Sequence, residues 1–238
     1  MTVLITGGSG ALGSELKKLF PDSLSPSHEI LDICDPDSVD ELFKKEKIDL
    51  VLHAAALTTV RGCEDDKSRA MQVNVTGTKN LVNQLQKSNP SGKFVYISTA
   101  CVFDGHSGMY NENSIPYPEN FYSLTKLLGE YETEKLENSL IIRTNFVARK
   151  KWPYPKAFTD RYGTYLFANQ VALGIKEVLD EGKTGIIHIV GNKKISMFEL
   201  AKITTPDIQP MTLSDYSGPP LTVDMSLDTK NWKKYDLI

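Results

Sequence analysis

Residues 1–20 read MTVLITGGSGALGSELKKLF, and this stretch decides the fold. A short β-rich run ends at Thr6, Gly7, Gly10 and Gly13 follow, and a helical pattern extends from Ala11 to Phe20. The glycines allow a tight turn and close approach to a pyrophosphate, and the free amides of the helix N-terminus favour negative charge there. The stretch predicts a strand, a phosphate-binding turn and a helix that begin a dinucleotide site.

The rest of the chain alternates between strand and helix patterns. Further strands are expected at 48–56, 93–99, 139–144 and 185–190, and helices at 35–47, 64–87, 122–136 and 169–181. Strands separated by helices predict an α/β fold, a Rossmann-like doubly wound parallel sheet that binds ligands beyond the carboxyl ends of its strands. We expect a dinucleotide-binding domain at 1–145 and a small C-terminal substrate lobe at 146–238. The lobe returns in part to the sheet, and 149–158 is expected to be a loop.

Composition excludes several classes of function. The 238 residues carry a net charge of -3 without a concentrated basic face, so no nucleic-acid partner is expected. Three widely spaced cysteines indicate neither a disulfide framework nor a metal site. No run approaches the roughly 20 apolar residues of a membrane span, and the start of the chain lacks a signal-peptide pattern. We expect a cytoplasmic protein without a membrane partner.

A tyrosine and a lysine are the candidate catalytic pair. Tyr122 and Lys126 stand four residues apart, on one face of the expected helix. A phenol has a pKa of about 10, and a neighbouring ammonium group lowers it toward the range useful for proton transfer. Ser98 and Thr99 end the preceding strand on the cofactor side, where the Thr99 hydroxyl is able to hydrogen-bond a substrate carbonyl.

Four segments together resemble the extended short-chain dehydrogenases/reductases: TGGSGALG, LDICD, HAAALT and VNVTGTKNL. In the last, Asn74 matches a position whose role is mostly structural. The resemblance implies a set of cofactor-binding residues: Gly7, Ser9, Gly10, Ala11, Leu12, Gly13, Asp32, Ile33, Ala54, Ala55, Ala56, Tyr122 and Lys126.

The cofactor preference depends on the residue that ends the second strand. An acidic residue about 20 positions beyond the glycines usually holds the adenosine ribose of NAD. Here that region reads SLSPSHE, with Ser25 and Pro26 where an acid would stand. A 2′-phosphate therefore meets no repulsion, although no arginine attracts it. We expect NADP(H) in preference to NAD(H).

Later segments resemble the dTDP-4-dehydrorhamnose reductase family, namely ISTACVFDG, PENFYSLTKLLGE, LIIRTNFV, GIIHIVG and MSLDTKNW. The resemblance implies hydride transfer to C4 of a nucleotide-linked 4-keto-6-deoxy sugar. Tyr122 would protonate the oxygen, Lys126 would hold the nicotinamide ribose, and Thr99 would orient the carbonyl. Thr99, Cys101, Asn145 and Phe146 are the expected substrate contacts. Ala100-Cys101 departs from the usual Asp-Tyr, and a shortened segment before Gly163 departs from the family's sugar-binding region.

Cys101 supports an alternative function, a bifunctional 3,5-epimerase/4-reductase of a nucleotide sugar. A cysteine two residues after the catalytic threonine is similar to GDP-fucose synthase and to the bifunctional UDP-4-keto-6-deoxyglucose 3,5-epimerase/4-reductase. A thiol is able to exchange protons next to a ketone if an acid serves the other face, and Lys150, Lys151 and Lys156 are the candidate partners. Alternatively, Cys101 is a small buried hydrophobic residue.

Three further expectations remain open. A non-catalytic regulatory subunit is the alternative of another class, because the regulatory subunit of methionine adenosyltransferase resembles the same reductases. A homodimer is expected by analogy with related enzymes. Arg143 is expected at a sheet edge, and the aromatic residues Trp152, Tyr154, Phe158 and Tyr162 are expected either to stack on a nucleobase or to pack internally.

Overall fold

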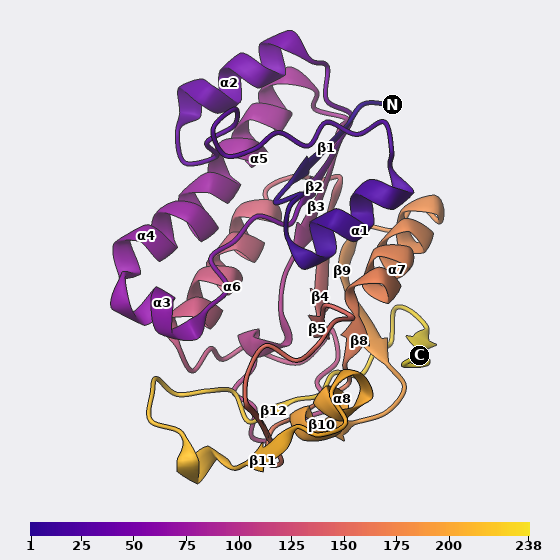
Figure 1. Cartoon of the computed structure of the whole chain (residues 1–238). Coiled ribbons are helices and arrows are strands. Elements are labelled where there is room, and N and C mark those ends of the chain that lie inside the picture. Colours follow the sequence, from indigo (N-terminus) through magenta and orange to yellow (C-terminus); the bar gives the residue numbers. More distant parts are fainter.

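A six-stranded sheet forms the centre of the computed structural model, which describes residues 1–238 (Figure 1). Its strands run in the order β1-β2-β3-β4-β9-β13, and every neighbouring pair is parallel. The strands span Val3–Thr6 (β1), Leu50–His53 (β2), Lys93–Ile97 (β3), Ser139–Thr144 (β4), Gly185–Gly191 (β9) and Lys234–Tyr235 (β13). The predicted parallel α/β architecture is confirmed.

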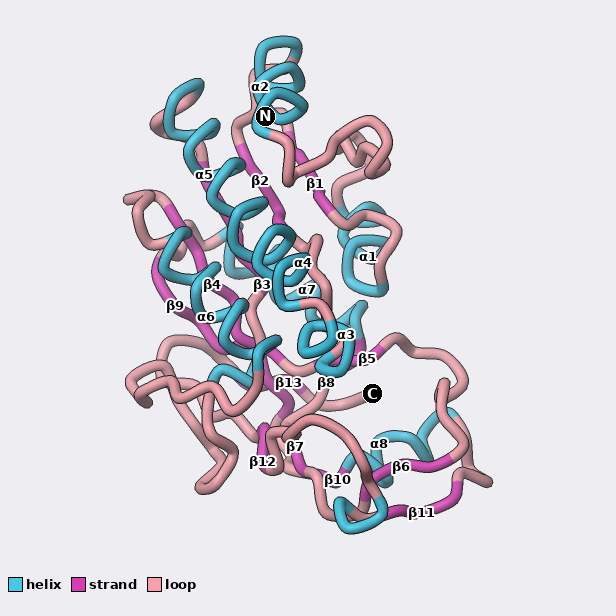
Figure 2. The backbone as a smooth tube through the Cα atoms, turned by 90° about the vertical axis from the view of Figure 1, so that its left-hand side faces the viewer, coloured by secondary structure: helices cyan, strands magenta, loops and turns pink.

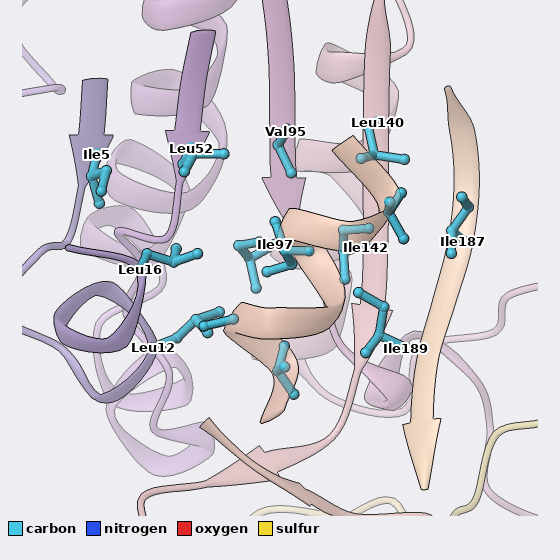
Figure 3. Packing of buried hydrophobic residues seen from close by; sticks show 14 of the residues in the cluster. Ile5, Leu12, Leu16, Leu52, Val95, Ile97, Leu140, Ile142, Ile187 and Ile189 are labelled. Carbon is cyan, nitrogen blue, oxygen red and sulfur yellow. The ribbon is translucent and has the colours of Figure 1, made fainter. Parts of the chain in front are cut away.

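Helices cover both faces of this sheet, as Figures 1 and 2 show from two directions. The face covered by α1 (Ala11–Leu19) and α7 (Ala168–Asp180) carries an apolar cluster, to which these two helices and five strands of the sheet contribute side chains, among them Leu12 and Leu16 of α1 (Figure 3). The opposite face packs against α2 (Pro36–Lys45) and α5 (Gly77–Ser88). Because both faces are buried, the strands consist of nearly continuous apolar residues.

The expected single helix at 64–87 is interrupted. It consists of α3 (Val60–Asp65), α4 (Lys67–Met71), one π-helical turn (Gln72–Thr76) and α5. The Asp66 side chain accepts a hydrogen bond from the Arg69 amide at 2.8 Å and so starts a new helix one residue after α3 ends. The amphipathic pattern across these helices did not reveal the break.

Short strands form a lobe beyond the carboxyl ends of β1 to β4, in the lower part of Figure 1. They span Phe146–Val147 (β5), Lys156–Phe158 (β6), Tyr162–Gly163 (β7), Leu166–Phe167 (β8), Ile195–Ser196 (β10), Gln209–Met211 (β11) and Asp224–Met225 (β12). Helix α8 (Met197–Thr204) lies among them. The expectation of a loop at 149–158 was wrong in part, because β6 pairs with β11. The domain boundary after residue 145 stays a prediction.

Helix α6 (Phe121–Thr133) packs beside α5 and against β3 and β4. None of the helices combines the length and the apolar run that crossing a bilayer requires.

Candidate active site

The turn after β1 has the geometry of a phosphate cradle. Gly7 has a φ of +71°, a conformation that favours glycine. A Cβ built on Gly13 would lie 2.2 Å from the Gly7 carbonyl oxygen, so only glycine allows α1 to approach the turn this closely. Gly10 precedes α1 and supplies no side-chain cap, which leaves the first amides of the helix free for an anion. These residues fit a dinucleotide pyrophosphate.

One cavity of about 890 Å³ extends from this turn to the lobe. It is large enough for an extended ligand such as a dinucleotide. All residues assigned to the cofactor and to the substrate from the sequence line it: Gly7, Ser9, Gly10, Ala11, Leu12, Gly13, Asp32, Ile33, Ala54, Ala55, Ala56, Thr99, Cys101, Tyr122, Lys126, Asn145 and Phe146. The fold therefore brings segments more than 100 residues apart in the sequence to one site.

Helix α6 presents the catalytic pair to this cavity. The Asn120 side chain accepts a hydrogen bond from the Ser123 amide at 2.9 Å and so caps the helix, which starts at Phe121, one residue before Tyr122. Lys126 follows one turn later, is buried, and places Nζ 4.0 Å from the centre of the Tyr96 ring. Thr99 follows β3 and accepts a hydrogen bond from the Cys101 amide at 3.1 Å.

The surroundings of Tyr122 favour its neutral, proton-donating form. Burial raises the pKa of the Tyr122 phenol, the Cys101 thiol raises it further, and a hydrogen bond with Thr99 lowers it. A phenol that holds its proton at neutral pH is suited to donate that proton to the oxygen of a reduced ketone.

Burial lowers the pKa of the Lys126 ammonium group, whereas it raises that of the Tyr122 phenol. The Lys126 pKa falls to about 7, and the Glu130 carboxylate one helical turn away offsets part of this lowering. Above that pH the lysine loses the charge that would stabilise the phenolate left by proton donation.

This shift predicts the pH dependence of the reaction. In the reductive direction, kcat/KM for the nicotinamide cofactor should fall about tenfold per pH unit above about 7, because the free enzyme then loses the Lys126 charge. Lys126→Arg, whose side chain stays charged, should lower the activity but abolish this alkaline limb. Steady-state rates from pH 6 to 9 test the expectation, with Lys135→Arg at an exposed position as control. If kcat/KM of Lys126→Arg still falls above pH 7, a group other than Lys126 is responsible for the pH dependence.

A buried ionic network supports the catalytic helix. Arg143 on β4 donates to Glu130 through Nε at 3.0 Å and Nη2 at 2.6 Å, and Ser98 donates to the same carboxylate. Arg143 is 2% exposed and lies on an inner strand, so the expectation of a sheet-edge position was wrong. The network ties α6 to the strand that ends beside Thr99.

Polar contacts also hold the loops where the family resemblance placed the adenosine. Asn74 donates to the Leu57 carbonyl at 3.0 Å and to Thr125 at 2.9 Å, so it links the loop after β2 to α6. Asp32 accepts a hydrogen bond from the Cys34 amide at 2.9 Å, which stabilises the turn where Asp32 and Ile33 line the cavity.

The structure brings Cys101 to the cavity but not its suggested partners. Cys101 Sγ lies 3.4 Å from Met225 Sδ. Lys150, Lys151 and Lys156 do not line this cavity, and Lys150 borders a separate hollow beside Arg149. The aromatic group of Trp152, Tyr154, Phe158 and Tyr162 is likewise absent from the lining; Trp152 is buried, and Phe158 packs on Tyr216 with ring centres 5.9 Å apart.

Three basic residues of the lining were not identified from the sequence: Lys17, Arg69 and Arg161. Lys17 and Arg69 lie on helix faces that look like ordinary solvated surface. Arg161 stands in a segment, TDRYGT, that carries no recognisable spacing.

Comparisons with known proteins show the family to which the chain belongs. The family model described as RmlD substrate binding domain matches residues 1–216. The dTDP-4-dehydrorhamnose reductase of Aggregatibacter actinomycetemcomitans is 31% identical, over 84% of this chain and 76% of that protein. Methionine adenosyltransferase 2 subunit beta of Rattus norvegicus is 28% identical, over 95% of this chain and 80% of that protein.

Solved structures of dTDP-4-dehydrorhamnose reductases also resemble this chain. A structure of a hypothetical dTDP-4-dehydrorhamnose reductase from Sulfolobus tokodaii is 33% identical with a TM-score of 0.84, covering 96% of this chain and 92% of that one. The Bacillus anthracis dTDP-4-dehydrorhamnose reductase in complex with NADP has a TM-score of 0.90 at 22% identity, covering 99% and 94%. The latter likeness bears on the fold alone.

Proposed function

Because the chain belongs to the RmlD substrate binding domain family, we propose that it uses NADPH to reduce the C4 ketone of a nucleotide-linked 4-keto-6-deoxy sugar. The chain is an oxidoreductase, in agreement with the reductases among its relatives. The observation that carries the proposal is that Thr99, Tyr122 and Lys126 line the same cavity as the glycine turn.

Different residues of the cavity carry out different parts of the proposed reaction. A reduced nicotinamide cofactor, held by the glycine turn of Gly7, Gly10 and Gly13, would supply the hydride. Thr99 donates a hydrogen bond that orients the carbonyl, and Tyr122 gives its proton to the oxygen as negative charge develops there. Lys126 stabilises the phenolate that remains, and Glu130 offsets part of the lowering of the lysine pKa by burial.

The direct test is turnover. The protein is mixed with NADPH and a 4-keto-6-deoxy sugar nucleotide carrying dTDP, UDP or GDP, and the loss of absorbance at the reduced-cofactor band is followed. We expect cofactor oxidation with one of the three. Cofactor binding without turnover of any of the three would contradict the proposal and favour the alternative of a non-catalytic regulatory subunit.

The epimerase alternative receives no support from the geometry, because no lysine from the 149–158 segment reaches the cavity. Cytoplasmic localisation and a homodimer stay predictions.

The preference for NADPH rests on the adenosine end. Leu24 takes the place of a second strand, with its amide 2.8 Å from the Val3 carbonyl, so Ser25 follows where an acid would hold a ribose. A Cβ built on Gly8 would lie 1.8 Å from Ser25 Oγ and 3.2 Å from Lys17 Cδ, so both side chains flank this glycine. A hydroxyl and an ammonium group here suit a 2′-phosphate.

This arrangement predicts the effect of removing the Lys17 charge. Lys17→Gln should weaken adenosine 2′,5′-bisphosphate binding about tenfold, equivalent to about 1.4 kcal/mol, and leave 5′-AMP binding unchanged. Titration calorimetry measures both ligands without any need for turnover. Lys18→Gln is the matched control, because Lys18 pairs with Glu15 outside this cavity. Equal losses for the two ligands would exclude a 2′-phosphate contact.

A further inference from the structure

Arg161 is a buried cation that no carboxylate of the chain neutralises. Its side chain lines the lobe end of the cavity, and the residue is only 8% exposed. Nε donates to the Thr222 carbonyl at 3.1 Å, and Nη2 contacts Met225 Sδ at 3.4 Å. The other deeply buried arginine, Arg143, has Glu130 at 2.6 Å, whereas Arg161 forms no salt bridge.

An uncompensated buried charge is costly, and proteins usually pair it. Asp224 on the neighbouring strand β12 does not neutralise Arg161, because Asp224 forms its salt bridge with Lys194. The third guanidinium nitrogen, Nη1, has no protein partner and is not among the fully buried unpaired atoms, so it opens toward the cavity. These two contacts and the Phe158 ring, whose centre lies 5.5 Å from Arg161 Cζ, hold the guanidinium in place but supply no negative counter-charge, which leaves that role to a ligand.

We propose that Arg161 binds a phosphate of the substrate's nucleoside diphosphate; this rests on the proposed function. A guanidinium matches phosphate oxygens in a two-pronged geometry. The cofactor pyrophosphate has its own cradle after β1, whereas Arg161 lies on the lobe side with Cys101 and Asn145. The hydroxyls of a neutral sugar would not compensate the charge.

Ligand binding tests this assignment without turnover. Titration calorimetry of dTDP, UDP and GDP, with NADP⁺ present and absent, is compared for wild type, Arg161→Gln and Arg61→Gln. Arg61 is the control, since it is exposed and donates to the Ser217 carbonyl at 2.7 Å outside the cavity lining. For the best-bound diphosphate, we expect Arg161→Gln to weaken affinity roughly 10- to 100-fold and Arg61→Gln to leave it unchanged.

Thermal unfolding separates a binding role from a structural one. Without ligand, Arg161→Gln should unfold at the wild-type temperature or higher, because a buried unpaired charge has been removed. A lowered unfolding temperature together with weakened NADP⁺ binding would indicate a structural role and overturn the proposal. So would unchanged diphosphate affinity in Arg161→Gln, or no diphosphate binding by the wild type. Reduction of the keto sugar by the wild type is measured separately. If the wild type is active and any of these three contrary results is obtained, the role of Arg161 is refuted and the proposed function stands.

Discussion

Tyr122→Phe is expected to lower kcat for ketone reduction by roughly 10²- to 10⁴-fold while leaving cofactor affinity within a few-fold of the wild type. The substitution removes one oxygen atom and with it the only phenolic proton that the cavity lining offers beside Thr99. The ring still fills its place on α6, so the binding surface for the nicotinamide is retained. Stopped-flow measurement of hydride transfer at saturating cofactor isolates this effect from binding.

Tyr131→Phe is the matched control for that experiment. Tyr131 lies on the same helix, is 54% exposed, and does not line the cavity, so its hydroxyl should be dispensable. If Tyr122→Phe keeps more than a tenth of the wild-type rate, then another group protonates the substrate oxygen and the assignment of Tyr122 fails.

Arg143→Met is expected to lower the free energy of unfolding by about 3–5 kcal/mol, because it leaves the Glu130 carboxylate buried without its counter-ion. Both partners are almost fully buried, at 2% and 1% exposure, so solvent does not screen the loss. Activity should fall as well, since the pair ties α6, which carries Tyr122 and Lys126, to the central strands. Equilibrium unfolding in urea measures the first effect.

A double substitution shows whether Arg143→Met loses stability because Glu130 is left as an unpaired buried charge or because packing is disturbed. Arg143→Met combined with Glu130→Leu should recover at least half of the lost stability, because both charges are then absent. Recovery should stay incomplete, since Ser98 loses the acceptor of its hydrogen bond. For comparison, Lys176→Met breaks an exposed pair with Asp180 and should change stability by less than about 1 kcal/mol. A double variant no more stable than Arg143→Met would point to packing rather than charge.

The sequence alone was sufficient for the parallel α/β sheet and for the cofactor and substrate residues that it assigned, all of which line the cavity. Local signals carry this information: glycines between a strand and a helix, apolar runs of strand length, and a Tyr-x-x-x-Lys spacing that places two side chains on one helix face. Since carboxyl ends of parallel strands meet at one edge of a sheet, the residues after β1, β2, β3 and β4 had to converge.

Tertiary structure alone decided where charge lies within that site. Lys17 and Arg161 look like ordinary basic residues in the sequence, yet one flanks Gly8 and the other is buried without an acid. Arg143 likewise became the buried partner of Glu130 rather than an edge residue. Burial and pairing depend on neighbours supplied by distant segments, and they set the electrostatic cost of a charge, whereas periodicity reports only the local backbone and the face on which a side chain lies.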